Sequence, residues 1–366
     1  MLLSKEILEQ ISPIEAEYVY AYIYNLYHKK VTPETTNYEN LSTMVECCPH
    51  CGSVHFIKYG FTNKGRQKYR CKDCNSIFGP TTGTLFAYSN TSYKDWIQFI
   101  ACEINGQTLD QETISIGKSR TTCFNMRHKL YSAVKKIQEN IVLKGQIQLD
   151  PAYTKINLKG TKPQNMPRIS KIRGKHKTNP NNKELAGISH HKICLISAKD
   201  EHDNILFKIA GLGPETIEKL VAFGDYFEVG STIISDSKPC IINFANQSRM
   251  ISETIPVIAN QQRYTTKKGN SLSEINQIHQ EFAELIRKKH GVSTRHLQGY
   301  IDWLVFCKQL KYKIDGKRRK VESYVDVMKE YITLKTRTIS SKPMPIDLYE
   351  AYGEYNYGIF SNPPTI

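Results

Sequence analysis

The sequence lacks any apolar run long enough to cross a membrane as a helix. Residues 1–18, MLLSKEILEQISPIEAEY, also lack the apolar core of a secretory signal and carry charges throughout. We therefore expect a cytoplasmic protein without a membrane partner. Because a reducing compartment disfavours disulfides, the ten cysteines are expected to be thiols or metal ligands.

Acidic residues are scarce relative to basic ones. The chain has 35 Asp and Glu against 50 Lys and Arg, which gives a formal net charge of +15. Such an excess usually indicates a polyanionic partner, most often nucleic acid, although a solvated surface that aids solubility is the alternative. The length of 366 residues is enough for two or more domains.

Four cysteines form the most specific pattern in the chain. They make two Cys-x-x-Cys pairs on either side of residues 52–70, and they are Cys48, Cys51, Cys71 and Cys74. Four thiolates at this spacing can close a tetrahedral Zn²⁺ site, and the alternating stretches VHFIKYG and QKYRC predict two short strands. We expect a zinc ribbon with structural Zn²⁺ over residues 46–90, with disulfides or buried thiols as the alternatives. Cys47 could compete as a ligand, but the pair spacing favours Cys48.

A helix-turn-helix motif is predicted within residues 91–140. Leu109–Ile116 can form a short helix, Gly117 a turn, and Ser119 the cap of a second helix that runs to about Gln138. The first half of a recognition helix contacts base edges. The residues predicted to do so are Arg120, Asn125, Arg127, His128 and Lys129. An ordinary helical hairpin with a charged solvent face would show the same pattern.

The remaining chain divides into three regions. Residues 1–45 have helical periodicity, residues 145–308 the pattern of a mixed α/β domain, and residues 309–366 form a C-terminal extension. In the α/β region, GQIQLDPAYTKINL alternates like a strand around Asp150, and TIISD predicts a buried strand that ends at Asp236. HKICLISAKD and NILFKIAG predict a hairpin, and SEINQIHQEFAELIRKKHG a helix.

A basic segment follows the first of these strands. Residues 155–177 carry only positive charges, interrupted by Gly and Pro. Because like charges repel when no counter-charge is near, we expect an extended arm that contacts DNA phosphates rather than a solvated loop. The residues assigned to this contact are Lys159, Lys162, Arg168, Lys171 and Arg173.

Two aspartates and a histidine form a candidate catalytic centre. Asp150 lies mid-strand among apolar neighbours, Asp236 ends an apolar strand, and His279 shares a helix face with Asn276. Carboxylates at strand ends that converge on one cleft could bind Mg²⁺ in a two-metal phosphoryl-transfer site. Each residue has an ordinary alternative, because a strand-end Asp is often a cap and a helical His is often packed or at the surface.

Several segments resemble zinc-ribbon transposases of bacterial insertion sequences. LDPAYTKINLKGTKPQNMPRISKIRGK looks like the opening of their catalytic domain, and INQIHQEF with HGVSTRHLQGYIDWLVF like its third catalytic segment. GKSRTTCFNMRHKL resembles the recognition helix and YRCKDCNSIFGPTTGT the end of the ribbon. The resemblance implies an RNase H-like fold and a DDE-type transposase. It makes Asp150 and Asp236 the Mg²⁺-binding aspartates and His279 the third catalytic residue, with Asn276 as its alternative.

The chain departs from this family at two positions. The family usually has an acidic residue directly after the first aspartate, where this chain has Pro151. A basic residue is often found one helical turn after the third position, where this chain has Ala283. Arg287 or Lys288 could supply the missing charge to DNA, and an inactive copy is left open.

These observations predict a multidomain α/β protein in which a zinc ribbon and a helix-turn-helix precede an RNase H-like mixed-sheet catalytic domain. We expect a nucleoid-associated DNA transposase that binds double-stranded DNA at terminal inverted repeats, cleaves it with Mg²⁺ and joins it to target DNA. Since two ends must be joined, a homodimer or larger synaptic complex is implied. The alternatives are an inactive, domesticated zinc-ribbon DNA-binding regulator and a nuclease of the same fold without strand transfer.

Overall fold

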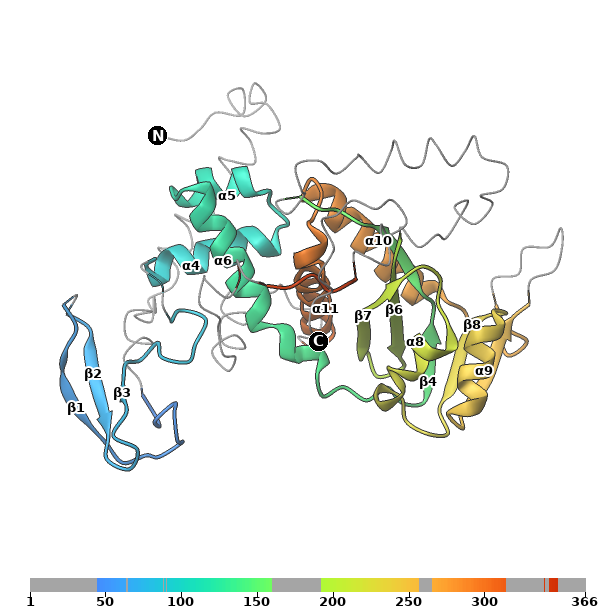
Figure 1. Ribbon diagram of the computed structural model, residues 1–366, viewed down its shortest axis with the longest axis horizontal. Coiled ribbons are helices and arrows are strands. Elements are labelled where there is room, and N and C mark those ends of the chain that lie inside the picture. The colour runs from blue at the N-terminus through green and yellow to red at the C-terminus, as the bar shows by residue number, and fades with distance from the viewer. Residues whose placement is uncertain are drawn as a thin grey trace, which may run out of the picture. The chain divides into compact units, whose positions relative to one another are not determined.

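The computed structural model describes residues 45–159, 192–256, 265–313 and 342–347 together with Ile339, apart from Lys64, Tyr88 and Asn90. The chain forms two compact units: one contains the residues up to Thr82 and Thr91–Lys94, and the other contains the rest (Figure 1). The predicted N-terminal helical region and most of the C-terminal extension lie outside the described residues. No helix within the described ranges is long and apolar enough to span a membrane.

The smaller unit is built around a three-stranded antiparallel sheet. Across the sheet its strands are β1 (Phe56–Phe61), β2 (Gln67–Cys71) and β3 (Ile77–Phe78). β1 and β2 form a hairpin that turns at Gly65, whose φ of 74° favours glycine. Tyr69 stacks on Phe78 with ring centroids 5.8 Å apart, and Phe56 lies edge-on to both. Because this core is small, it contributes little free energy and leaves the unit dependent on a further cross-link.

Three helices follow the ribbon in the sequence: α4 (Tyr93–Ile104), of which Asp95 onward belongs to the larger unit, α5 (Leu109–Ile116) and α6 (Arg120–Ala133). α5 begins with a capping box between Thr108 and Gln111, and Gly117, with a φ of 67°, ends it. The Ser119 hydroxyl caps α6 by accepting from the Thr122 N–H at 3.2 Å. The first residues of α5 and α6 agree with the sequence prediction. The predicted helix to about Gln138 is shorter, because α6 ends at Ala133 and a separate 3₁₀ turn, η1 (Lys135–Gln138), follows it.

A buried ion network joins these three helices to the C-terminal end of α10 (Ser273–Lys288). The Arg127 side chain, only 4% exposed, pairs with Glu103 of α4 and Glu112 of α5. The Lys289 ammonium lies 2.9 Å from Glu103, and the Tyr131 hydroxyl donates to the same carboxylate at 2.7 Å. Burial alone would raise the pKa of Glu103, but Arg127 and Lys289 hold that pKa at about 2, so the carboxylate stays ionised.

Burial corrects the prediction that Arg127, His128 and Lys129 read DNA. All three residues are between 3% and 4% exposed. Arg127 forms the ion pairs described above. The centres of the His128 and His296 rings are 4.0 Å apart, and the Lys129 ammonium donates to the carbonyl of Ala87 at 3.3 Å. These side chains are committed to the interior because α6 is a core helix in which most residues are buried.

The larger unit contains a six-stranded mixed sheet with the order β5-β6-β4-β8-β9, and β7 also pairs with β6. The strands are β4 (Gln146–Leu149), β5 (Ala152–Lys155), β6 (Lys192–Asp200), β7 (Ile205–Leu212), β8 (Thr232–Asp236) and β9 (Ile251–Ile255). β6 and β7 form the predicted antiparallel hairpin, whereas β4, β8 and β9 run parallel. The mixed α/β class predicted from the sequence is therefore confirmed.

Pro151 splits the strand predicted around Asp150 into β4 and β5. Both parts pair with β6 in one register, because Leu149 lies opposite Ala198 and Ala152 opposite Leu195. Proline cannot donate to the ladder, but the Asp150 N–H still reaches the Ser197 carbonyl at 3.1 Å. The proline interrupts the hydrogen bonding without shifting the strand.

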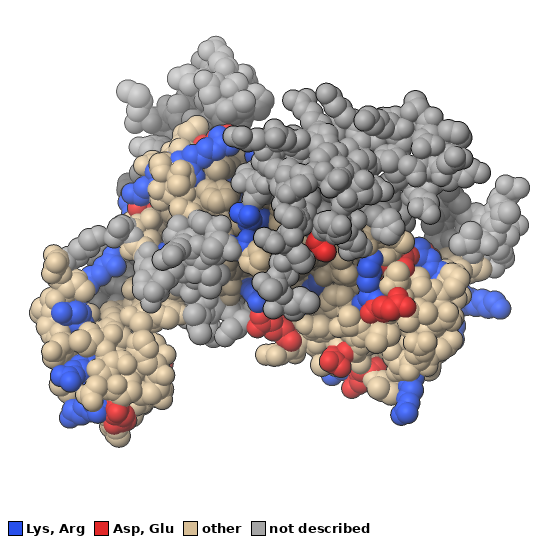
Figure 2. Space-filling model, in the orientation of Figure 1, with Lys and Arg blue, Asp and Glu red and all other residues tan. Residues whose placement is uncertain are grey.

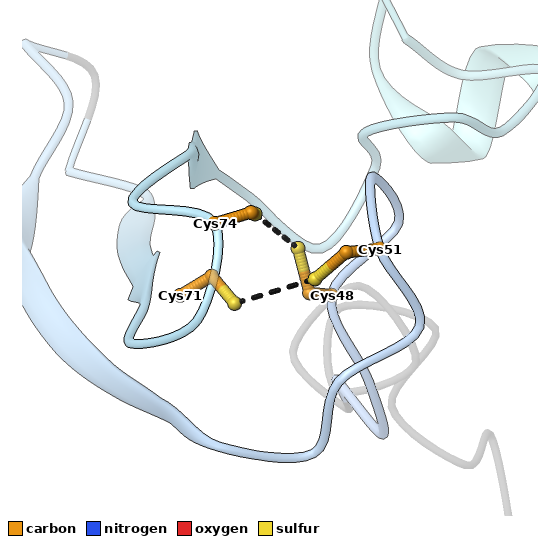
Figure 3. A group of neighbouring side chains, drawn as sticks. All are labelled: Cys48, Cys51, Cys71 and Cys74. Carbon is orange, nitrogen blue, oxygen red and sulfur yellow. Dashed lines mark hydrogen bonds between the residues drawn. The ribbon is translucent and has the colours of Figure 1, made fainter.

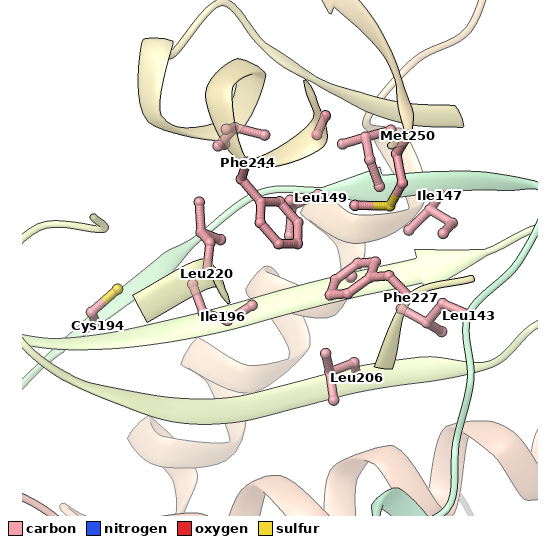
Figure 4. Packing of buried hydrophobic residues seen from close by; sticks show 14 residues of the cluster. Leu143, Ile147, Leu149, Cys194, Ile196, Leu206, Leu220, Phe227, Phe244 and Met250 are labelled. Atoms are coloured by element: carbon pink, nitrogen blue, oxygen red, sulfur yellow. The ribbon is translucent and has the colours of Figure 1, made fainter. Parts of the chain in front are cut away.

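Side chains alternate between two differently packed faces of this sheet. Ile147 and Leu149 enter a buried apolar cluster (Figure 4), to which α8 (Ile217–Val221) and α9 (Pro239–Gln247) contribute Leu220 and Phe244. On the opposite face, the Gln148 side chain accepts from the Ile275 N–H of α10 at 3.1 Å. α11 (Leu297–Lys313) packs against β7. Since side chains alternate with a period of two, Asp150 lies on the α10 face.

Replacing Arg127 should test the ion network. We expect Arg127→Ala to reduce the free energy of unfolding by about 3–5 kcal/mol, because Glu103 and Glu112 would lose a buried partner. Urea unfolding measures the loss. Arg120→Ala is the matched control: its 2.6 Å pair with Asp110 is 64% exposed, so its loss should stay below about 1 kcal/mol. Equal losses in the two variants would contradict the network's role.

The packed His128 and His296 rings should make the larger unit sensitive to acid. Burial lowers the pKa of His128 to about 2 and that of His296 to about 4, both below the ordinary value of 6.5. The unfolded chain therefore binds more protons, and stability should be full above pH 6.5 and fall between pH 6.5 and 4. We expect His296→Phe to flatten the slope of unfolding free energy against pH, whereas exposed His202→Gln should leave it unchanged.

Candidate functional site

The four predicted cysteines converge in the smaller unit (Figure 3). Their sulfur atoms all lie within 4.8 Å of one another, and the sulfurs of Cys48 and Cys74 and of Cys51 and Cys71 are each 3.6 Å apart. Sulfurs around a tetrahedral zinc with 2.3 Å bonds would be separated by about 3.8 Å. Four close thiols in this arrangement could bind Zn²⁺.

Each Cys-x-x-Cys pair lies in a tight turn. In the first pair, the Gly52 N–H donates to the Cys48 carbonyl at 2.8 Å, and Gly52 has a φ of 74°. In the second, the Cys71 N–H donates to the Ser76 carbonyl at 3.0 Å. Cys47 is exposed and outside the group, so the structure selects Cys48.

A second candidate site lies at one end of the six-stranded sheet. β4 and β8 are parallel neighbours, with Gln148 opposite Ile234. Asp150 lies two residues after Gln148 and Asp236 two residues after Ile234, so both carboxylates lie at the same edge of the sheet. Asp236 Oδ1 is buried and has no hydrogen-bond partner among the described residues.

Glu215 and Lys238 are further charged groups at this edge, and the sequence analysis missed both. The Lys238 ammonium lies 3.3 Å from Asp236 Oδ2 and 3.0 Å from Glu215 Oε1. The Glu215 side chain is only 6% exposed. It precedes Thr216, the N-cap of α8, so its segment GPET had the ordinary pattern of a helix start. The only sequence signal was an acid placed shortly after a buried strand.

His279 of α10 faces Asp150. Its Nδ1 atom is 3.6 Å from Asp150 Oδ2, and its Nε2 atom is 2.6 Å from the Ser197 hydroxyl. Burial lowers the pKa of His279 to about 4, so the ring is neutral at pH 7. Burial also raises the pKa of Asp150 to about 6, where Lys238 opposes the shift and the charges of Asp236 and Glu215 add to it.

The hydrogen bonds of Ser197 assign the tautomer of His279. The serine hydroxyl donates its one proton to the Asp150 carbonyl, so it must accept from His279 Nε2. The Nδ1 lone pair of the neutral ring then points toward the Asp150 carboxylate. A neutral imidazole nitrogen and a carboxylate oxygen that face each other are donors which a divalent cation could share.

The structure brings together three of the four residues predicted to be catalytic. Asp150 and Asp236 lie at the ends of neighbouring parallel strands and His279 lies against Asp150, whereas Asn276 is exposed one turn earlier on α10. His279 also borders a cavity of about 830 Å³ between β5 and α10, which Ala283 helps to line. The small side chain at this position therefore opens space beside the histidine.

The remaining predicted DNA contacts differ in placement. Arg120 is exposed and paired with Asp110, Asn125 is half-buried, and Lys159 is exposed. The other residues of the basic segment, Lys162, Arg168, Lys171 and Arg173, lie outside the described residues. Arg287 and Lys288 are both at the surface and share Glu284 as a partner.

Comparison with known proteins gives one partial relationship. No protein-family model matches the chain. Over 114 residues the chain is 30% identical to a protein of Halobacterium salinarum described as an uncharacterized protein in transposable element ISH50. The match covers 31% of this chain and spans 38% of the length of that relative. It links the chain to an insertion element and leaves its activity undefined.

Removing one cysteine ligand should abolish zinc binding. We expect Cys48→Ser to lose its bound Zn²⁺ and to unfold the smaller unit, because this small core depends on the cross-link. Elemental analysis of the purified protein and proteolysis of the ribbon measure the two effects. Cys47→Ser, which changes an exposed neighbour outside the group, should retain the metal; zinc loss in both variants would refute the assignment.

Proposed function

We propose that this protein is a DDE-type DNA transposase with an RNase H-like catalytic domain. The observation that carries the proposal is the placement of Asp150 and Asp236 at the ends of two parallel strands, with His279 against Asp150. The partial relationship to a protein of a transposable element supports the same function. The substrate would be double-stranded DNA at the ends of an insertion element.

The proposed chemistry uses Mg²⁺ held by Asp150, Asp236 and His279. When bound, Mg²⁺ would activate the attacking oxygen and stabilise the leaving oxygen of a phosphodiester. The chain's own contribution is positioning: Ser197 holds His279 with its Nδ1 lone pair toward Asp150, and the sheet holds the two aspartates. Hydrolysis at the element end would free a 3′-hydroxyl, which would then attack target DNA.

The smaller unit is proposed to address the enzyme to DNA. Its zinc would be structural, and exposed basic side chains on it include Lys58, Arg66 and Lys72. Figure 2 shows basic side chains over this unit with fewer acidic ones. The Arg70 guanidinium lies 5.5 Å from the centre of the half-exposed Tyr59 ring, a pairing of aromatic and cation that also suits a nucleic-acid surface.

The proposal extends to the assembly and to the remaining DNA contacts. Arg120 and Asn125 of the helix-turn-helix segment, and the basic segment that begins near Lys159, would bind terminal inverted repeats and target DNA. Because two ends must be joined, the active form would be a homodimer or a larger complex on the nucleoid.

A DNA-binding regulator without catalysis is the second candidate function. Two observations favour it: Pro151 replaces the acid usual after the first aspartate in the family that the chain resembles, and the Lys238 ammonium already pairs with Asp236. Such a protein would keep the ribbon and bind the same DNA, but it would leave the DNA uncut.

A cleavage and strand-transfer assay separates the two candidates. The substrate is DNA carrying the inverted repeats that flank the gene, with Mg²⁺ or Mn²⁺ as the metal. We expect cut and joined products. Asp236→Asn should reduce the rate at which they form by more than about a hundredfold. Mutating a residue that only supports a metal ligand usually costs up to about a hundredfold, and losing the ligand itself should cost more.

Asp225→Asn is the matched control, because Asp225 is an exposed aspartate in the 3₁₀ turn η3 (Gly224–Tyr226). It should keep full activity. DNA binding without any divalent-metal-dependent products would favour the regulator, and cut products without joined ones would favour a nuclease.

A further inference from the structure

Glu215 is a buried acid at the proposed catalytic edge that no part of the expected centre uses. Its side chain is 6% exposed, and one oxygen, Oε1, pairs with the Lys238 ammonium at 3.0 Å. The other oxygen, Oε2, is buried without a hydrogen-bond partner among the described residues. Burying an unsatisfied carboxylate oxygen costs free energy, so a group that pairs with Oε2 would stabilise this site.

Asp236 has the same deficiency on the other side of Lys238. Its Oδ2 atom lies 3.3 Å from the ammonium, and its Oδ1 atom is buried and unpartnered in the described part of the chain. One ammonium thus bridges two carboxylates, and each of them keeps one free oxygen.

Lys238 places its ammonium between the carboxylates of Asp236 and Glu215. A flexible ammonium between two carboxylates occupies a place where a hard cation would find oxygen ligands, and the lysine side chain can leave it by rotating about its own bonds.

We infer that Glu215 is a carboxylate ligand of a divalent-cation site shared with Asp236, and that Lys238 is the built-in competitor for that site. The inference rests on the proposed function, because it places the site at the same catalytic edge. It differs from the expected centre in that the added ligand comes from the segment between β7 and α8 and not from α10. Lys238 then sets the metal concentration at which the site fills.

The two partners should affect metal affinity in opposite directions. The test is calorimetric titration of the full-length, zinc-loaded protein with Mn²⁺ alone. We expect Glu215→Gln to weaken Mn²⁺ binding by about tenfold or more, because a ligand and a charge are lost. Lys238→Met should strengthen binding by about tenfold, because the competing charge is removed. A purely structural ion pair would lower the melting temperature in both variants and leave the Mn²⁺ affinity of each unchanged.

Controls separate this inference from the proposed function. Glu281→Gln breaks a comparable pair, 2.8 Å from Lys308 on α10 and α11, and should leave Mn²⁺ affinity unchanged. If Asp236→Asn abolishes binding while Glu215→Gln and Lys238→Met bind like the unaltered protein, the inference is overturned and the proposed centre stands. If the unaltered protein does not bind Mn²⁺, both fail. Should Glu215→Gln not fold, the gain expected for Lys238→Met decides the question.

Discussion

The parallel pairing of β4 and β8 is the constraint on which the candidate centre depends. Two carboxylates repel each other, so Asp150 and Asp236 cannot hold the strands together themselves. Apolar packing does so: Ile147 and Ile233 are both part of the cluster beneath α8 and α9. Slipping either strand by one residue would turn its aspartate to the opposite face and bury polar groups in that cluster. The free energy of the core therefore sets the geometry of the acids.

The basic residues of this chain serve physically different purposes, which net charge alone does not distinguish. Arg127 and Lys289 are buried and both pair with Glu103, where they join helices from distant parts of the sequence. Lys58 and Arg66 are exposed to solvent on the ribbon. Lys238 lies between these extremes, since its charge is held against two acids at a site that another cation could take.

The two candidate metal sites differ in the chemistry of their donors. Four thiolates suit zinc, and their closed arrangement leaves no position for a substrate. Carboxylate oxygens and a neutral imidazole suit a harder, partly hydrated cation that can also bind phosphate. The unpartnered oxygens of Asp236 and Glu215 belong to the second kind of site. A stabilising metal and a catalytic metal would thus be selected by different ligands in separate parts of the fold.

The sequence by itself determined the features that depend on local spacing. The Cys-x-x-Cys pairs, the Gly117 turn, the Ser119 cap and the β6–β7 hairpin each involve residues that are near in the chain. It also indicated Asp150, Asp236 and His279 as candidates, although periodicity could not bring them together.

Tertiary structure alone decided the rest. It buried Arg127, His128 and Lys129, left Asn276 in solvent, kept the strand register across Pro151, and added Glu215 and Lys238 to the sheet edge. The physical reason is that burial and pairing depend on which distant segments pack against a residue. A helical pattern with several basic residues does not reveal which of them will find a buried carboxylate such as Glu103 as a partner.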